Sequence, residues 1–247
     1  MMNLLEKYYG QSVELVDSGF GSGGFNMDYD LERAKAVEDG KLPAMFRLYA
    51  WEPWCLSLGY NQKDDDVDYS ELKDRGYDLV RRPTGGRAVF HANEITYSFV
   101  IRLNDDLNIH EIYKDIHLMF INVFLGMGIE LDFVRSGTNL REFYKLEGIS
   151  NSCFASSARY EVCSGGRKIV GSAQRVIGRT LLQHGSILIG REHLEIVQLL
   201  KHSSLESRGR LLEFIKSKSV SLGELSDNKL DYGLISAEIF RYLKALA

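Results

Sequence analysis

The feature that most constrains the fold of this chain is the repeated change in the spacing of its apolar residues. The segment 95–102 is rich in β-branched and aromatic residues, as strands are. The segment 109–127 instead repeats apolar residues every three to four positions, and Gly126 and Gly128 mark its end, which is typical of a helix. Because the two spacings alternate along the chain, we predict a mixed α and β protein.

The same patterns predict the remaining elements. Further strands are expected at 12–16, 46–51, 55–59, 77–81, 88–90, 129–134, 159–162, 168–170 and 181–189. Helices are expected after an Asn26 N-cap and after an Asp68 N-cap that leads to Gly76.

Helical spacing dominates the end of the chain, at 192–201, 208–216 and 234–246, with Ser221 capping a short turn of helix. We therefore predict a sheet-centred catalytic region over residues 1–190. A helical C-terminal extension over 191–247 is expected to pack on the same domain.

Composition excludes several classes of function. The chain has 247 residues, of which 45% are hydrophobic and 26% charged, as in an average globular protein, and its net charge of −4 does not favour nucleic acid. No stretch approaches the roughly 18 apolar residues that span a bilayer, and no signal peptide is evident, so we expect a cytoplasmic protein with no membrane partner. The three cysteines have no zinc-site spacing, so free thiols and no bound metal are expected.

The loop 81–87, RRPTGGR, is the first candidate for chemistry. The adjacent Gly85 and Gly86 let backbone approach a ligand closely, and arginines hold planar anions. The loop therefore suits a ligand-cradling role, although a glycine hairpin with solvated arginines has the same pattern. His91, soon after it, suits either a substrate contact or a packed, hydrogen-bonded histidine.

Cys153 lies among small polar residues, which suits an accessible thiol. A free thiol has a pKa of about 8.5, and a nearby ammonium favours the thiolate. Lys168 lies in a segment that can form a hairpin with 159–163, returning towards Cys153. Cys163 and Cys55, in contrast, have the surroundings of structural residues in strands.

His184, in the segment QHGSIL, is a further candidate as a general base. No Ser or Asp pattern beside it forms a recognisable triad, and a bend in a strand is the alternative interpretation.

Taken together, these segments resemble the biotin/lipoate protein ligase superfamily over roughly residues 15–190. The resemblance rests on Asn26-Met27-Asp28, RLYAWEPWCLSLGYNQ (47–62), RRPTGGRAVFHANEITYS (81–98), the Cys153 segment, GRKIVGSAQR (166–175) and LLQHGSIL (181–188). It implies an α+β fold in which a large and a small mixed β-sheet are flanked by helices, with the helical C-terminal extension added.

Within the superfamily the chain is most similar to the cysteine-dependent octanoyltransferases of lipoate assembly. These share a Cys-Phe pair ahead of a GRK-x-x-GSAQ segment, whereas ligases typically have a third glycine where this chain has Arg87. The resemblance assigns the thioester-forming role to Cys153 and the pKa-lowering role to Lys168. It implies a substrate-binding role for Arg82, Thr84, Gly85, Gly86, Arg87, His91, Gly171, Ser172, Gln174, His184 and Gly185.

The implied reaction moves an octanoyl group from octanoyl-acyl carrier protein to Cys153 and then to a lysine of a lipoyl domain. The acceptor would be a protein such as the glycine cleavage H protein or a 2-oxoacid dehydrogenase acyltransferase subunit. Thioester exchange followed by amide formation requires neither ATP nor a cofactor. A local basic face near Arg81, Arg82 and Arg87 is expected to steer acidic carrier domains.

Three alternatives stay open at this point. An ATP-dependent lipoate-protein ligase is disfavoured by Arg87 and by Ala92–Glu94, where ligases tend to have Asp and a Gly-Asn pair. An amidotransferase would move octanoyl between lipoyl-type domains with the same cysteine and lysine. A non-catalytic carrier-binding module would use neither.

Overall fold

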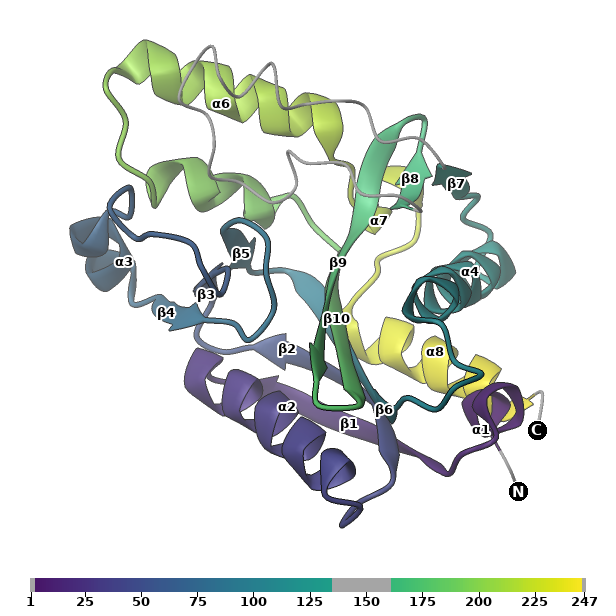
Figure 1. The fold of residues 1–247 in the computed structure, drawn as a ribbon. Helices are drawn as coiled ribbons and strands as arrows, with labels where there is room; N and C mark the ends of the chain where they lie inside the picture. The colour runs from purple at the N-terminus through teal and green to yellow at the C-terminus, as the bar shows by residue number, and fades with distance from the viewer. Residues whose placement is uncertain (1–2, 135–160, 246–247) are drawn as a thin grey trace.

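The computed structural model describes residues 3–134 and 161–245, and it is built around one seven-stranded sheet (Figure 1). Only β1 and β2 are parallel; each of the other neighbouring pairs is antiparallel. Across the sheet the strands are β1 (Val13–Gly21), β2 (Ala44–Trp51), β6 (Glu94–Arg102), β10 (Thr180–Leu188), β9 (Arg167–Ile177), β8 (Glu161–Ser164) and β7 (Asp132–Val134).

A second sheet of three strands lies beside the first. Its central strand β3 (Cys55–Leu58) is parallel to β4 (Asp78–Arg81) and antiparallel to β5 (Val89–His91). The predicted large and small mixed sheets are therefore confirmed. Because β4 and β5 are joined by the loop 82–88, the glycine-rich loop begins and ends on this small sheet.

Helices cover both faces of the large sheet (Figure 1). The long helix α2 (Gly23–Glu38) connects β1 to β2 and packs on β2, β6 and β10. On the other side α4 (Ile109–Gly126) and α8 (Tyr232–Ala245) share a core with β6. The remaining helical segments are α1 (Leu4–Tyr9), α3 (Tyr69–Arg75), the 3-10 helix η2 (Glu192–Gln198), α6 (Leu205–Lys218) and α7 (Leu222–Leu225).

The C-terminal helices contribute buried residues to the apolar cluster on the large sheet and to the one on the small sheet. Ile235 and Ile239 of α8 are fully buried with β6 and α4, whereas Ile215 of α6 packs with the small sheet. The segment after residue 190 therefore covers apolar surface of the sheets that it follows. No helix in the described ranges is long and apolar enough to cross a membrane.

Some predicted boundaries differ from the structure. The N-cap of α2 is Ser22, and Asn26 lies inside the helix, where its side chain donates to the carbonyls of Gly21 and Ala50. Asn26 is buried, so its hydrogen-bonding groups serve the junction of α2 with β2 and not the helix terminus. The helix α1 was not predicted, and the expected strand 129–134 begins only at Asp132.

A buried carboxylate, Asp30, fixes α2 to the sheet. Asp30 Oδ1 accepts from Arg47 Nη1 at 2.9 Å and from Ser98 Oγ at 2.8 Å, and Oδ2 accepts from Tyr49 OH at 3.0 Å. The side chains of Asp30 and Arg47 are both fully buried. Burial alone would raise the pKa of Asp30, but hydrogen bonding with His184 and the charge of Arg47 outweigh it and hold the pKa below its usual value.

We predict that Asp30→Ala lowers the free energy of unfolding by about 3–5 kcal/mol, because it leaves the Arg47 guanidinium buried without its carboxylate. Glu71→Ala is the control, since it breaks the half-exposed ion pair with Arg75 and should cost less than about 1 kcal/mol. Urea denaturation of both variants measures the difference. Equal losses would contradict the proposed importance of the buried pair.

Candidate active site

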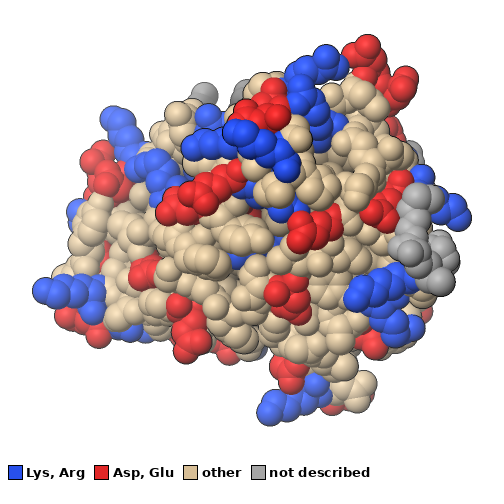
Figure 2. Space-filling model, turned by 90° about the horizontal axis from the view of Figure 1, so that it is seen from below, with Lys and Arg blue, Asp and Glu red and all other residues tan. Residues whose placement is uncertain are grey.

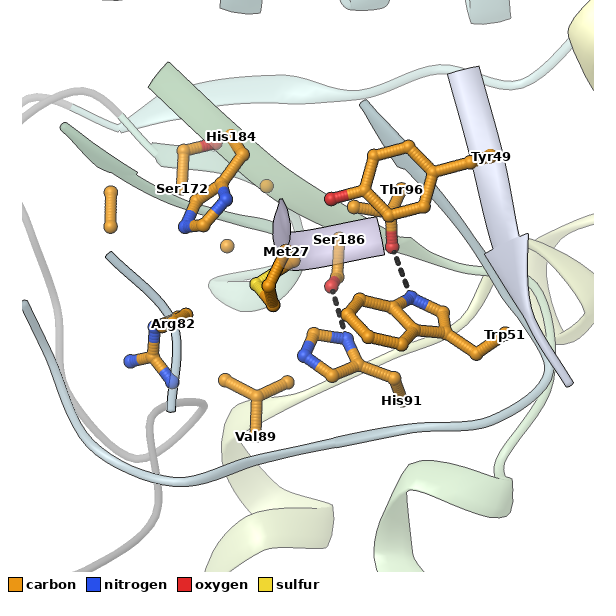
Figure 3. A pocket seen from close by; sticks show the side chains of 13 residues that line it. Met27, Tyr49, Trp51, Arg82, Val89, His91, Thr96, Ser172, His184 and Ser186 are labelled. Carbon is orange, nitrogen blue, oxygen red and sulfur yellow. Dashed lines mark hydrogen bonds between the residues drawn. The ribbon is translucent and has the colours of Figure 1, made fainter. Parts of the chain in front are cut away.

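A pocket lies where α2, both sheets and the glycine-rich loop meet (Figure 3). The space between its walls is about 380 Å³, a volume that includes the part open to solvent. Six of the predicted substrate-binding residues line it, namely Arg82, His91, Gly171, Ser172, His184 and Gly185. The other lining residues are Met27, Tyr49, Trp51, Val89, Thr96, Ala173 and Ser186.

The glycine-rich loop is held by its own first arginine. Arg82 is buried, and its guanidinium donates to the carbonyl of Ser57 at 3.1 Å, of Gly85 at 2.9 Å and of Arg87 at 2.6 Å. The loop also lies directly against Gly59, where an added Cβ would meet the carbonyl oxygen of Gly86 at 1.9 Å. The solvated-hairpin interpretation is therefore wrong for Arg82, and so is its place in a surface basic face.

Thr84 connects the loop to the centre of the large sheet. Its hydroxyl lies 2.5 Å from His184 Nε2, and His184 Nδ1 lies 3.9 Å from Asp30 Oδ2. Burial lowers the pKa of His184, against the opposing effect of Asp30, so the neutral imidazole is favoured. The neutral form has one donor and one acceptor nitrogen, which suits an N–H directed at the carboxylate and a lone pair directed at Thr84.

His91 belongs to a second buried network, which closes the opposite wall of the pocket. Its Nδ1 lies 2.7 Å from Glu94 Oε1, and its Nε2 lies 2.7 Å from Ser57 Oγ. Glu94 Oε1 also accepts from Thr96 at 2.7 Å and from Ser186 at 2.6 Å. Glu94 is not itself among the lining residues, whereas its partners His91, Thr96 and Ser186 are.

The β9–β10 pair forms the third wall. Ser172 Oγ lies 2.7 Å from Tyr97 OH and 2.8 Å from His117 Nε2. Gly185, directly opposite Ser172, has no room for a side chain, because an added Cβ would meet Ser172 Oγ at 2.4 Å. Gln174 does not line the pocket; its amide donates to the Ile109 carbonyl and to Gln183 Oε1.

Lys168 lies on β9, three residues before Gly171, in the predicted hairpin with β8. Its ammonium Nζ lies 2.6 Å from Glu161 Oε1, and both side chains are more than nine-tenths buried. The hairpin also places Cys163 directly opposite Lys168. Cys153 lies outside the described residues, so its distance from Lys168 stays a prediction.

Cys163 is close to a lysine but has no thiolate character. Burial raises its pKa to about 11, with a further rise from the charge of Glu161 that Lys168 only partly offsets. Cys55 is buried in β3, and burial raises its pKa as well. Neither of these described cysteines is therefore suited to act as a nucleophile at neutral pH.

Sequence reasoning did not single out Asp30 or Glu94, although each organises one wall of the pocket. One feature of the sequence does point to Asp30: its carboxylate lies on the apolar face of the helix, in line with Met27 and Ala34. A charge at such a position is buried when the helix docks, and a buried charge needs partners. Glu94 follows His91 by three residues within a strand-forming segment, and no local pattern marks it.

A family model described as the lipoyl protein ligase A/B catalytic domain matches residues 22–244. The chain is 37% identical over 220 residues to an octanoyltransferase LipM of Kyrpidia tusciae, covering 87% of this chain and 80% of that protein. It is 36% identical over 238 residues to an octanoyltransferase LipM of Moorella thermoacetica, covering 94% and 85%.

Solved structures are similar in fold. A bipartite lipoate protein ligase from Thermoplasma acidophilum, solved in work on an archaeal lipoylation system with its E2 lipoyl domain, superimposes with a TM-score of 0.70 at 18% identity. The match covers 93% of this chain and 81% of that one. At this identity the likeness establishes the fold alone.

We predict that Cys163 resists alkylation in the native protein. A pKa of about 11 in place of the ordinary value of about 8.5 reduces its thiolate fraction by more than 100-fold at neutral pH. Peptide mass spectrometry after iodoacetamide treatment compares the native protein with the same protein unfolded in urea. Labelling of Cys163 in the native protein at a rate within about tenfold of the unfolded rate would contradict the prediction.

Proposed function

The chain belongs to the family of lipoyl protein ligase A/B catalytic domains, and from that membership we propose that it carries octanoyl groups on Cys153 during lipoate assembly. The observation that carries the activity is the likeness to LipM octanoyltransferases over 87% and 94% of this chain. The protein is accordingly an acyltransferase. The Cys153 thioester, the acyl donor and the acceptor are the parts that we propose.

The pocket supports an acyl substrate. Met27, Val89 and Trp51 offer apolar surface, while the hydroxyls of Thr96 and Ser186 are bonded to Trp51 or Glu94. An alkyl chain entering this space would gain about 0.8 kcal/mol for each CH₂ that it buries. Binding energy of this kind holds the acyl group while the thioester forms and reacts.

Strand β9 links the pocket to Lys168, the proposed partner of Cys153. It carries both Lys168 and the lining residues Gly171 and Ser172, so the lysine is about 10 Å along the strand from the pocket wall. In the first half-reaction the Cys153 thiolate attacks the octanoyl thioester of the acyl carrier protein and expels its thiolate. In the second, a lysine amine of a lipoyl domain attacks the enzyme thioester, forms an amide and releases Cys153.

Lys168 is the proposed electrostatic partner of Cys153. An ammonium near the thiol favours the thiolate. When Lys168 gives its proton to the departing carrier thiolate it becomes a neutral amine, which can then accept a proton from the attacking amine and return to the ammonium. Backbone N–H groups of the glycine-rich loop and of Gly171–Gln174 are suited to stabilise the tetrahedral oxyanion. Neither step consumes ATP.

Two protein substrates must reach one site. We propose octanoyl-acyl carrier protein as donor and a lipoyl-domain protein as acceptor. The basic rim that steers them would comprise Arg81 and Arg87, since Arg82 is buried. On the face shown in Figure 2, acidic and basic side chains are interspersed, so this face offers no broad area of one sign for an acidic domain. The free thiols Cys55 and Cys163 are in keeping with a reducing compartment such as the cytoplasm.

We predict transfer of octanoyl from octanoyl-acyl carrier protein to a lipoyl domain without ATP, and its loss in Cys153→Ala. Three assays with purified protein separate the alternatives. A ligase would require ATP and the free acid, and an amidotransferase would require an octanoylated lipoyl-type domain as donor. A carrier-binding module would transfer nothing with any donor, and any of these three outcomes would contradict the proposal.

A second prediction concerns Lys168. Removing its ammonium in Lys168→Ala should raise the pH midpoint for alkylation of Cys153 by about one to two pH units, because the thiolate loses a neighbouring positive charge. The rate of iodoacetamide labelling between pH 5 and about 10 gives the midpoint. Lys41→Ala is the control, since Lys41 is exposed and paired with Asp39. An unchanged midpoint in Lys168→Ala would remove the proposed role.

A further inference from the structure

The ammonium of Lys168 is unusual in being almost fully buried against a carboxylate. Lysine and glutamate are seldom buried, and a buried ammonium is retained only when it is paired. The turn Gly165-Gly166 has φ values of 55° and 73°, as a tight two-residue hairpin turn needs. Beyond it, Lys168 faces Cys163, and Glu161 lies two residues further along the same face of β8. The hairpin therefore delivers Glu161 Oε1 to Lys168 Nζ at 2.6 Å.

The backbone of Lys168 is held by a segment from the other end of the chain. Strand β10 pairs with β9 only as far as Val170, and Leu188 is its last residue. Beyond that point, Ser219 forms a parallel bridge with Lys168, and the Val220 N–H donates to the Lys168 carbonyl at 3.0 Å. The C-terminal extension thus replaces β10 beside β9 at the residue that carries the ammonium.

This segment is itself firmly anchored. Ser219 Oγ donates to the Ile215 carbonyl at 2.9 Å and lies 2.8 Å from His193 Nε2. The Gly223 N–H donates to the Ile189 carbonyl at 3.0 Å, just after β10 ends. Ser219 is therefore bonded both to the end of α6 and to η2, so these helical segments fix where Lys168 lies.

We propose that Lys168 is held by a two-part clamp, in which Glu161 fixes its ammonium and Ser219–Val220 of the C-terminal extension fix its backbone. Glu161 and Ser219 are then positioning residues for the reactive centre, a role that rests on the proposed function of Lys168. To stabilise the thiolate of Cys153, the Lys168 side chain must carry its positive charge and must be held near the sulfur. Removing the Glu161 carboxylate takes a neighbouring negative charge from a buried ammonium, and this weakens the hold on its position.

A simpler role for Glu161 makes the opposite prediction. If Glu161 only offset the charge of a lysine fixed by other contacts, Glu161→Gln would leave Lys168 in place with more uncompensated charge. The pH midpoint of Cys153 alkylation would then fall. A clamp instead predicts that the midpoint rises, as in Lys168→Ala, because the ammonium is lost from its position.

The test measures Lys168 directly. Native protein is treated with acetic anhydride over a range of pH, and acetylation of each lysine is followed by peptide mass spectrometry. In the wild type we expect Lys168 to react at least about tenfold more slowly than the exposed Lys41. Glu161→Gln should increase the rate of Lys168 acetylation by at least about tenfold. Glu161→Asp keeps the negative charge on a shorter side chain, so its rate should lie between those of the wild type and Glu161→Gln.

The C-terminal half of the clamp has its own pair of variants. Ser219→Ala removes both contacts of the hydroxyl and should accelerate acetylation of Lys168 severalfold. Ser217→Ala is the control, because its hydroxyl also bonds a helical carbonyl, that of Phe214, but is exposed. Glu130→Gln is the control for Glu161→Gln, since Glu130 is an exposed carboxylate just before β7. Melting temperatures show which variants are folded, and Ser219→Ala carries the test if Glu161→Gln does not fold.

Unchanged Lys168 acetylation in Glu161→Gln and Ser219→Ala would overturn the clamp, as would a fall in the Cys153 midpoint in Glu161→Gln. In octanoyl transfer, the clamp predicts a lower kcat with little change in KM for both variants, whereas their controls keep wild-type values. Failure of the proposed function would look different. The wild type itself would then transfer no octanoyl, while the acetylation pattern of Lys168 could still support the clamp.

Discussion

The structure depends first on the burial of one carboxylate. The Asp30 carboxylate is shielded from water, so protein groups must supply its hydrogen bonds and compensate its charge. Its partners come from β2, β6 and β10. Because those strands are neighbours in the large sheet, the carboxylate sets where α2 crosses the sheet and where Met27 enters the pocket. Through His184 the same network reaches Thr84, and so it also fixes the glycine-rich loop. The polar core of the fold and one wall of the site are therefore linked, through the hydrogen bonds of Asp30 and Thr84 and the 3.9 Å contact between His184 and Asp30.

The opposite wall follows the same physical logic with a second carboxylate. Glu94 forms hydrogen bonds with three residues that line the cavity, His91, Thr96 and Ser186 (Figure 3). The surface that faces the cavity is mostly carbon. The hydrogen bonds of both networks lie in buried surroundings, where they are costly to break.

Much of this could be predicted from local sequence, and the remainder depends on contacts that local sequence does not encode. Strand β6, helix α4 and the hairpin at Gly165-Gly166 each have a clear pattern of their own. The N-cap preference of asparagine predicts a helix terminus at Asn26, whereas its amide donates to the carbonyls of Gly21 and Ala50.

The bridge from Ser219 to Lys168 joins residues far apart in sequence, and the hairpin that carries Glu161 and Lys168 contains a register shift after Val162. Six predicted site residues meet at the pocket because three strands and one loop bring them there, and Gln174 does not join them because its amide is used by Ile109 and Gln183.

The central claim is that the acyl group passes through Cys153 and not through the two buried thiols. Intact mass measurement after mixing with octanoyl-acyl carrier protein, without ATP, tests it most directly. The wild type and Cys163→Ala should each gain the mass of one octanoyl group, and Cys153→Ala should gain none. An octanoyl adduct that persists in Cys153→Ala, or that disappears in Cys163→Ala while the protein remains folded, would contradict the account.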